Sequence, residues 1–316
     1  MFSLTSSSRR RSGAALLAAS ALLLASASCT APRSIITSGK VTPKGEFRAG
    51  YNAGFNIASA PVAQAGGAVK EAASQAANDS KVDYSETTNQ LQAAALAYVL
   101  DPVQTTSDFF IRYGIAPRLD AGYKYTFGSH VLDAQYQLLG PTGSVEKPGA
   151  GAAPGTLYAS VGLQVASQRA KLPSLPFLSD INSVLNLHAT RYDILIPLTF
   201  SNSLGTEEEI GAISYGVAYG HTWMTYGFAP TKIYVNNSNG SVQVPALPDQ
   251  SRNFSSFGGF VNLKIGYRYI YFVPAVSVFY QNYGEFALLN NNSVSLKGVT
   301  VIPSIGLQLR IPNFSN

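Results

Sequence analysis

The side chains that could perform catalysis are few and widely spaced. The chain of 316 residues contains one cysteine, Cys29, and three histidines, His130, His188 and His221. Their spacing matches no metal-ligand pattern, and the chain has neither a G-x-S-x-G nucleophile elbow nor a phosphate-binding glycine loop. His221 lies between Tyr219 and Trp223, which favours a place in an aromatic belt over a catalytic role. We therefore expect no enzymatic activity, no metal and no cofactor.

Charged residues are more informative, because they recur at every second position of apolar runs. In RYGIAPRLDAGYKYTFG, residues 112–128, apolar side chains at 119, 121, 123, 125 and 127 alternate with polar or small ones. A period of two is typical of a β-strand with one apolar and one polar face. We expect the polar faces to line the lumen of a barrel and their charges to pair, forming a salt-bridged floor in preference to a solute-selecting lining. The charged residues assigned to this face are Arg48, Arg112, Arg118, Asp120, Lys124, Asp133, Arg191, Asp193, Lys264, Arg268 and Arg310.

The elements that would position these charges are about ten strands. The alternation covers residues 47–57, 109–115, 119–127, 132–138, 157–165, 192–200, 213–223, 261–269, 272–280 and 299–311. Each run has about the length that a tilted strand needs to cross a bilayer. Residues 58–105 interrupt the pattern with helix-forming Ala, Gln and Glu, so we predict a helical insertion after the first strand, as an outer cap, a plug in the lumen or a weakly ordered loop.

The links between these strands alternate in length, as in a barrel with long outer loops and short inner turns. Two links are exceptions: the one at residues 128–129 is short and the one at residues 140–155 is long. Eight or twelve strands therefore remain alternatives to ten. YVNNSNGSVQV, in the long link at residues 225–254, is typical of a hairpin that turns at Asn239-Gly240 and projects beyond the barrel.

Composition agrees with a protein whose surface does not face water everywhere. Hydrophobic residues make up 46% of the chain and charged residues 12%, about half of the usual charged fraction. The formal net charge of +5 falls to +5 − 3 = +2 without the arginines at 9–11, which is too little to indicate nucleic-acid binding. A soluble β-protein that buries its apolar faces between sheets is the remaining alternative.

The first 44 residues are expected to direct and tether the protein. A basic stretch, an apolar run over residues 13–25 and small residues up to position 28 indicate a secretory signal peptide, residues 1–28. ASASC resembles a bacterial lipobox, which would make Cys29 the lipidated first residue, and the alternative is ordinary cleavage after residues 25–27. Residues 29–44 then form a polar tether, and residues 45–316 the barrel.

The chain as a whole resembles bacterial outer-membrane β-barrel proteins with a lipoprotein-type leader, of the kind common in Bacteroidota-like genomes. The fold class is therefore all-β, an antiparallel up-and-down transmembrane barrel. Its C-terminal SIGLQLRI, with Ser304, Gly306, Leu309 and Ile311, resembles the β-signal read by the barrel-assembly machinery. Aromatic residues at strand ends, Tyr219, Trp223, Tyr267 and Tyr269, suit the two bilayer interfaces.

This resemblance implies a location in the outer membrane of a Gram-negative cell, with membrane lipid and the assembly machinery as partners. It also implies a non-enzymatic role, either structural or binding, or as a narrow passive pore. An outer-membrane enzyme acting on lipid or peptide is the second possibility.

Overall fold

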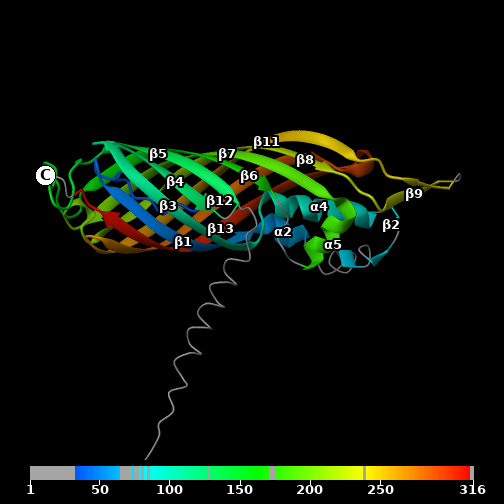
Figure 1. Cartoon of the computed structure of the whole chain (residues 1–316), viewed down its shortest axis with the longest axis horizontal. Coiled ribbons are helices and arrows are strands. Elements are labelled where there is room, and N and C mark those ends of the chain that lie inside the picture. The colour runs from blue at the N-terminus through cyan, green and yellow to red at the C-terminus, as the bar shows by residue number, and fades with distance from the viewer. Residues whose placement is uncertain are drawn as a thin grey trace, which may run out of the picture.

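The structure, a computed structural model, describes residues 33–64, 73–74, 78–79, 82–83, 86–126, 128–170, 176–237 and 240–313. In these residues, ten strands close into one antiparallel barrel (Figure 1). The strands are β1 (Phe47–Ala58), β3 (Gln104–Ala116), β4 (Leu119–Thr126), β5 (Ser129–Leu139), β6 (Leu157–Ala170), β7 (Leu187–Leu204), β8 (Gly211–Phe228), β11 (Leu247–Tyr267), β12 (Ile270–Ala287) and β13 (Ser293–Ile311).

Each barrel strand pairs with its neighbours in chain order, and the first and last barrel strands join. β1 pairs with β3 on one side and with β13 on the other, where Phe47 lies opposite Ile311. This closed up-and-down order confirms the predicted fold class with ten strands. No second sheet covers the barrel in the part of the chain that the structure describes. The remaining three-stranded sheet, formed by β2 (Val82–Asp83), β9 (Ile233–Asn237) and β10 (Gly240–Gln243), is small and lies at one end.

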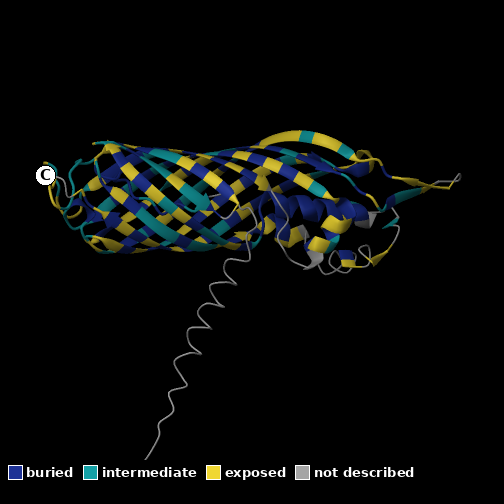
Figure 2. Cartoon of the chain, in the orientation of Figure 1, coloured by how far each residue is buried: buried dark blue, intermediate teal, exposed yellow. Residues whose placement is uncertain are grey.

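The outer wall of the barrel is an exposed apolar girdle, and Figure 2 shows how exposed and buried residues alternate along its strands. On β12 the outward side chains from Ile270 to Tyr280 are apolar or aromatic and largely exposed. Ten residue steps of about 3.3 Å, tilted by about 40°, correspond to about 25 Å, which matches the hydrocarbon core of a membrane. Such a surface is stable only in lipid, so the barrel spans a membrane. Among the described helices, none has the length and apolarity that a membrane crossing requires.

The apolar side of the wall reverses beyond the girdle. On β8 the outward residues up to Trp223 are apolar or aromatic except for His221, whereas Met224, Tyr226 and Phe228 point inward and are buried. They enclose helix α4 (Glu86–Leu100), whose residues 91–100 are all buried. Helix α5 (Pro176–Leu185) joins the same apolar core, which also contains Phe286 of β12. We call this end of the barrel the head.

The head also contains helix α2 (Ser59–Gln64), strand β2 (Val82–Asp83) and the hairpin of β9 (Ile233–Asn237) and β10 (Gly240–Gln243). The long links to β3, β7 and β11 lie here, together with the short link to β13 at residues 288–292 (Figure 1). The opposite end, which we call the turn end, has mainly short links, including the 3-10 turn η1 (Thr206–Glu208). Both exceptional links are present, a tight turn between β4 and β5 and a long loop at residues 140–156 at the turn end.

Candidate functional site

Residues 33–44, which we call the lumen segment, run lengthwise through the barrel. Arg33 lies below the head, where its Nη1 is 3.0 Å from Oδ2 of Asp101 just after α4. Lys44 lies at the turn end, bridged to Gly114, and the chain then enters β1. Most of the segment is buried. The predicted tether of residues 29–44 is thus packed inside the barrel in its described part, and Cys29 lies outside the described residues.

Side chains of the wall bind the backbone of the lumen segment, as they would bind any extended peptide. Asn262 donates to the carbonyls of Ile35 and Thr37, at 3.4 and 3.0 Å. Arg48 donates to the carbonyls of Lys40 and Val41, at 3.0 and 3.2 Å. The remaining contacts are Gln135 to the Ser38 carbonyl, and the amides of Gly39, Val41 and Thr42 to Ser201, Gln137 and Asp120. Buried backbone groups need such partners, so the polar wall compensates for a segment that has no strand neighbour over this stretch.

Two side-chain positions of the segment fit the wall closely. Ile35 packs in a cluster with four buried wall residues, Leu195, Ala218, Phe260 and Phe279. Gly39 passes the backbone of β6 so closely that a Cβ there would lie 2.6 Å from the carbonyl oxygen of Tyr158. Only glycine fits that position without movement of the wall.

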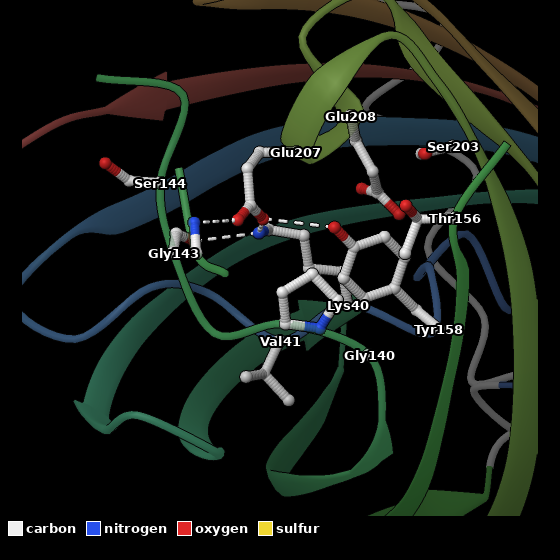
Figure 3. Close-up of polar contacts among 12 residues, drawn as sticks. Lys40, Val41, Gly140, Gly143, Ser144, Thr156, Tyr158, Ser203, Glu207 and Glu208 are labelled. Atoms are coloured by element: carbon white, nitrogen blue, oxygen red, sulfur yellow. Dashed lines mark hydrogen bonds and ion pairs between the residues drawn. The ribbon is translucent and has the colours of Figure 1, made fainter. Parts of the chain in front are cut away.

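Lys40 forms the buried ion pair at the turn end that Figure 3 shows. Its Nζ donates to Oε2 of Glu207 and, at 2.8 Å, to the carbonyl of Gly143. Glu207 also accepts from Tyr158 Oη at 3.1 Å and from the Gly149 amide at 2.7 Å. The lumen segment, the wall and loop 140–156 therefore meet at one carboxylate.

The neighbouring Glu208 forms a second ion pair, with Lys264. Burial alone would raise the pKa of the Glu208 carboxyl, but the charges of Lys264 and Arg48 outweigh it and hold this pKa below its ordinary value. Glu207 and Glu208 both have left-handed backbones, with φ of 55° and 62°, a conformation that costs energy for residues with a Cβ. This backbone conformation directs both carboxylates inward, where each forms an ion pair.

At the head, Asp101 collects the other set of polar contacts. Its carboxylate accepts from Arg33, from Asn56 at 2.6 Å and from Gln281 at 2.7 Å. The carbonyl of Leu100, at the C-terminal end of α4, accepts from Arg191 at 2.7 Å, where the helix dipole favours a cation. The lumen segment and α4 are thus attached to the same wall.

The charges of the lumen balance. Among the described residues, seven basic and seven acidic side chains are buried: Arg33, Lys40, Arg48, Arg112, Arg191, Lys264 and Arg310 against Glu46, Asp101, Asp108, Asp120, Asp193, Glu207 and Glu208. Lys124 and Asp133, which are half-buried, add one of each sign. Arg112 pairs with both Asp120 and Asp133, Arg191 with Asp193, and Arg310 with Glu46. A neutral, paired interior favours the structural interpretation of these charges.

Nine of the eleven charged residues assigned to the lumen lie inside the barrel, and two lie at the turn end. Arg118 donates to the carbonyls of residues 137, 138 and 140 beside its own turn. Arg268 occupies the β11–β12 turn, is 43% exposed and pairs with Glu209. The strand period assigns a face correctly within a strand, but it does not apply to a turn residue.

The predicted aromatic and C-terminal residues lie on the wall. Tyr219 and Trp223 face outward near the head, and Tyr267 and Tyr269 face outward at the turn end. The β-signal residues lie on β13, with Ser304 buried and Leu309 and Ile311 exposed on the girdle.

Beside the lumen segment, the described residues leave two small cavities. One cavity of about 40 Å³ lies beside Ile36, Asp108 and Arg112, and another of about 20 Å³ beside Arg33 and Asp193. A water molecule needs about 10–15 Å³ by this measure, so each cavity has room for a few waters at most.

Each histidine has polar partners, two of them for His221, and in the described residues none is hydrogen-bonded to both a serine and a carboxylate. His188 Nε2 is 2.6 Å from Asp249 on the exposed head, and His130 Nδ1 is 2.7 Å from Tyr123 Oη. His221 Nδ1 is 3.0 Å from Ser255 Oγ on the outer wall. The described residues contain no group of three His, Cys, Asp or Glu side chains that could hold a metal.

Sequence reasoning missed the contacts that fill the lumen. Asp101, Glu207 and Glu208 fall in links and Lys40 precedes the first strand, where alternation gives no information about direction. A run of three acidic residues in a short link, at 207–209, was the one available signal, because such a run beside a lipid-embedded wall needs basic partners.

Comparisons with known proteins give only distant likenesses. No protein-family model matches the chain, and no curated protein matches its sequence. Among solved structures, the attachment invasion locus protein Ail of Yersinia pestis is 9% identical with a TM-score of 0.27, covering 86% of this chain and 100% of that chain. The translocator domain of the autotransporter NalP from Neisseria meningitidis is 6% identical with a TM-score of 0.35, covering 96% and 95%. The outer membrane protease OmpT from Escherichia coli is 10% identical with a TM-score of 0.25, covering 89% and 99%. Likenesses this weak assign no function to the chain.

Proposed function

We propose that this protein is an outer-membrane β-barrel whose lumen is closed to solutes and whose role is structural or binding, without catalysis. The observation that supports closure is the lumen segment, which fills the barrel from Asp101 to Glu207. Two cavities that the described residues line beside it have room for a few waters each. Of the two non-enzymatic roles expected from the sequence, this favours the structural or binding barrel over the passive pore.

The outer-membrane location rests on the apolar girdle together with the signal peptide predicted for residues 1–28. A closed barrel is one of the two architectures that satisfy backbone hydrogen bonds in hydrocarbon, and the last strand ends with the β-signal pattern. The girdle alone can hold the protein in the bilayer. We therefore expect Cys29→Ala to remove lipid from the protein but to leave it in the outer-membrane fraction; release into a soluble fraction would contradict membrane insertion.

Conductance of the full chain in planar bilayers tests closure. We expect the wild-type protein to show no steps above background. Gly39→Val should produce steps, because its side chain would clash with the Tyr158 carbonyl and displace the lumen segment. Thr37→Val, which keeps the shape of the side chain two residues away, serves as the control and should stay silent. Steady conductance of the wild type would overturn the proposal.

The contact between His221 and Ser255 favours a second candidate function, hydrolysis of lipid acyl esters. Ser255 Oγ also lies 3.0 Å from Tyr219 Oη, and the three side chains face outward where the girdle meets the head. Histidine beside serine can activate the hydroxyl as a nucleophile. Release of fatty acid from phospholipid vesicles that is lost in Ser255→Ala but kept in Ser251→Ala would establish this activity; equal rates would exclude it for this pair.

A further inference from the structure

We propose that the lumen is a binding site for an extended basic peptide, occupied in this structure by residues 33–44 of the chain itself. The inference rests on the proposed closure of the lumen and adds the ligand class that closes it. The wall contacts the segment as a receptor contacts a peptide: through the backbone along its length and through a few side chains at fixed spacing.

The backbone contacts define the extended conformation of the ligand. Eight hydrogen bonds join wall side chains to five carbonyls and three amides between positions 35 and 42. None of them depends on the side chain of the bound residue. They would hold any strand that enters in this register.

The side-chain contacts define the sequence of the ligand. Arg33 and Lys40 are seven positions apart. They form ion pairs with Asp101 and Glu207, respectively, at opposite ends of the lumen. Between them, Ile35 enters an apolar cluster and position 39 accepts only glycine. The pattern Arg-x-Ile-x-x-x-Gly-Lys therefore describes the peptide that this wall recognises.

The charge balance shows why the ligand must be basic. With the lumen segment in place the interior has eight basic and eight acidic groups. Without Arg33 and Lys40 the wall would hold 8 − 2 = 6 basic and 8 acidic groups, a net charge of −2. Buried charge without a counter-charge is costly, so the wall attracts a ligand with two cations, and an emptied lumen would favour cations over anions.

The test uses the full chain with both cations removed, Arg33→Gln and Lys40→Gln, in planar bilayers. We expect this variant to migrate as a folded barrel, to conduct and to prefer cations. A synthetic peptide of residues 33–44 should reduce the conductance at least tenfold, and the same peptide with Gln at both cationic positions should need at least a hundredfold higher concentration. Equal block by both peptides, or a silent folded variant, would overturn the inference while leaving the closed wild-type barrel intact.

A crosslink gives a second measurement that does not depend on conductance or on the stability of that variant. Ser34 Oγ and Ser304 Oγ are 3.0 Å apart, so cysteines at both positions can form a disulfide. The full chain with Cys29→Ser and Ser304→Cys is unfolded in urea and refolded into vesicles with excess peptide 33–44 that contains Ser34→Cys, in a buffer of reduced and oxidised glutathione, in which the oxidised form accepts the two electrons and protons of the two thiols. We expect a disulfide-linked product with this peptide. A control peptide that contains the same Ser34→Cys together with Arg33→Gln and Lys40→Gln should not form it. Absence of the product from correctly refolded barrel would contradict peptide binding.

Discussion

Glu207→Gln isolates the buried ion pair that holds the lumen segment at the turn end. The substitution keeps the size of the side chain: the amide oxygen can still accept from the Gly149 amide in place of Oε1, and the amide nitrogen, in place of Oε2, can donate to Tyr158 Oη. What it removes is the counter-charge of Lys40, which is 3% exposed. Breaking a buried pair by removing one partner costs about 3–5 kcal/mol, which is about two to four orders of magnitude in an equilibrium constant.

Release of the lumen segment limits how much of this cost appears as unfolding. If the segment leaves the lumen at a lower cost than 3–5 kcal/mol, Lys40 reaches water and the barrel itself stays folded. Urea unfolding in lipid vesicles, followed by the fluorescence of Trp223, the single tryptophan of the chain, measures barrel stability. Protease digestion at Lys40 measures release. We expect Glu207→Gln to show a lower unfolding free energy, faster cleavage, or both.

The double variant Lys40→Met, Glu207→Gln tests the cause. Replacing both members of a buried pair with groups of similar volume is often neutral, so we expect this variant to recover most of the stability lost by Glu207→Gln alone. Equal instability of the single and double variants would refute the reasoning, because the loss would then come from packing and not from an unpaired charge.

Three further changes test other parts of the fold. Val278→Arg on the girdle should destabilise the inserted barrel by about 2–4 kcal/mol in vesicle unfolding, whereas Ser295→Arg on the same wall within the head should have little effect. Leu96→Ala in the core of the head should cost about 2–5 kcal/mol of local stability and speed proteolysis of the head, while the heat-dependent gel shift of the barrel stays unchanged. The Arg310 hydrogen bond holds the pKa of Glu146 below its ordinary value of 4.5, so its contribution is present above that value and is lost as the pH falls through the lowered pKa; loop 140–156 should become protease-sensitive over that range in the wild type, and Glu146→Gln should remove the pH dependence.

The membrane-spanning part of the fold follows closely from the sequence, because lipid imposes one rule on every strand. The outward position of Val278 and its neighbours depends only on a period of two and on the absence of water outside. The predicted girdle and ten-strand closure are therefore confirmed. The face of Arg112 or Arg191 follows from the same period, and burial then requires that each has an acidic partner.

The head could not be predicted in the same way, because the rule reverses there. Met224, Tyr226 and Phe228 have the parity that indicates a polar lumen lower in β8, yet they pack on α4. β11 begins at Leu247, fourteen residues before the predicted start. Its first part is mostly polar and exposed to water, so it lacks the alternation of apolar and polar side chains on which the prediction relied. Helix α5 lies in the link between β6 and β7, for which the sequence analysis predicted no helix.

The lumen segment was predicted as a tether because its composition is that of one. Ser, Thr, Pro and Lys are typical of solvent-exposed segments, and residues 33–44 show no alternation of apolar and polar side chains. Their burial depends on partners such as Asn262 and Glu208, more than 160 residues away in the chain. The sequence of the segment itself does not indicate these distant partners.

The seam between β1 and β13 has a consequence for the order of folding. It joins residues 47 and 311, the longest loop closure in the barrel, and such closures form late. The lumen segment leads directly into β1, so a barrel that closed first would have to admit this segment into an interior whose described cavities have room for only a few waters each. We therefore expect residues 33–44 to bind the wall while it is still an open sheet. β1 and β13 would then pair last, around a segment that is already in place.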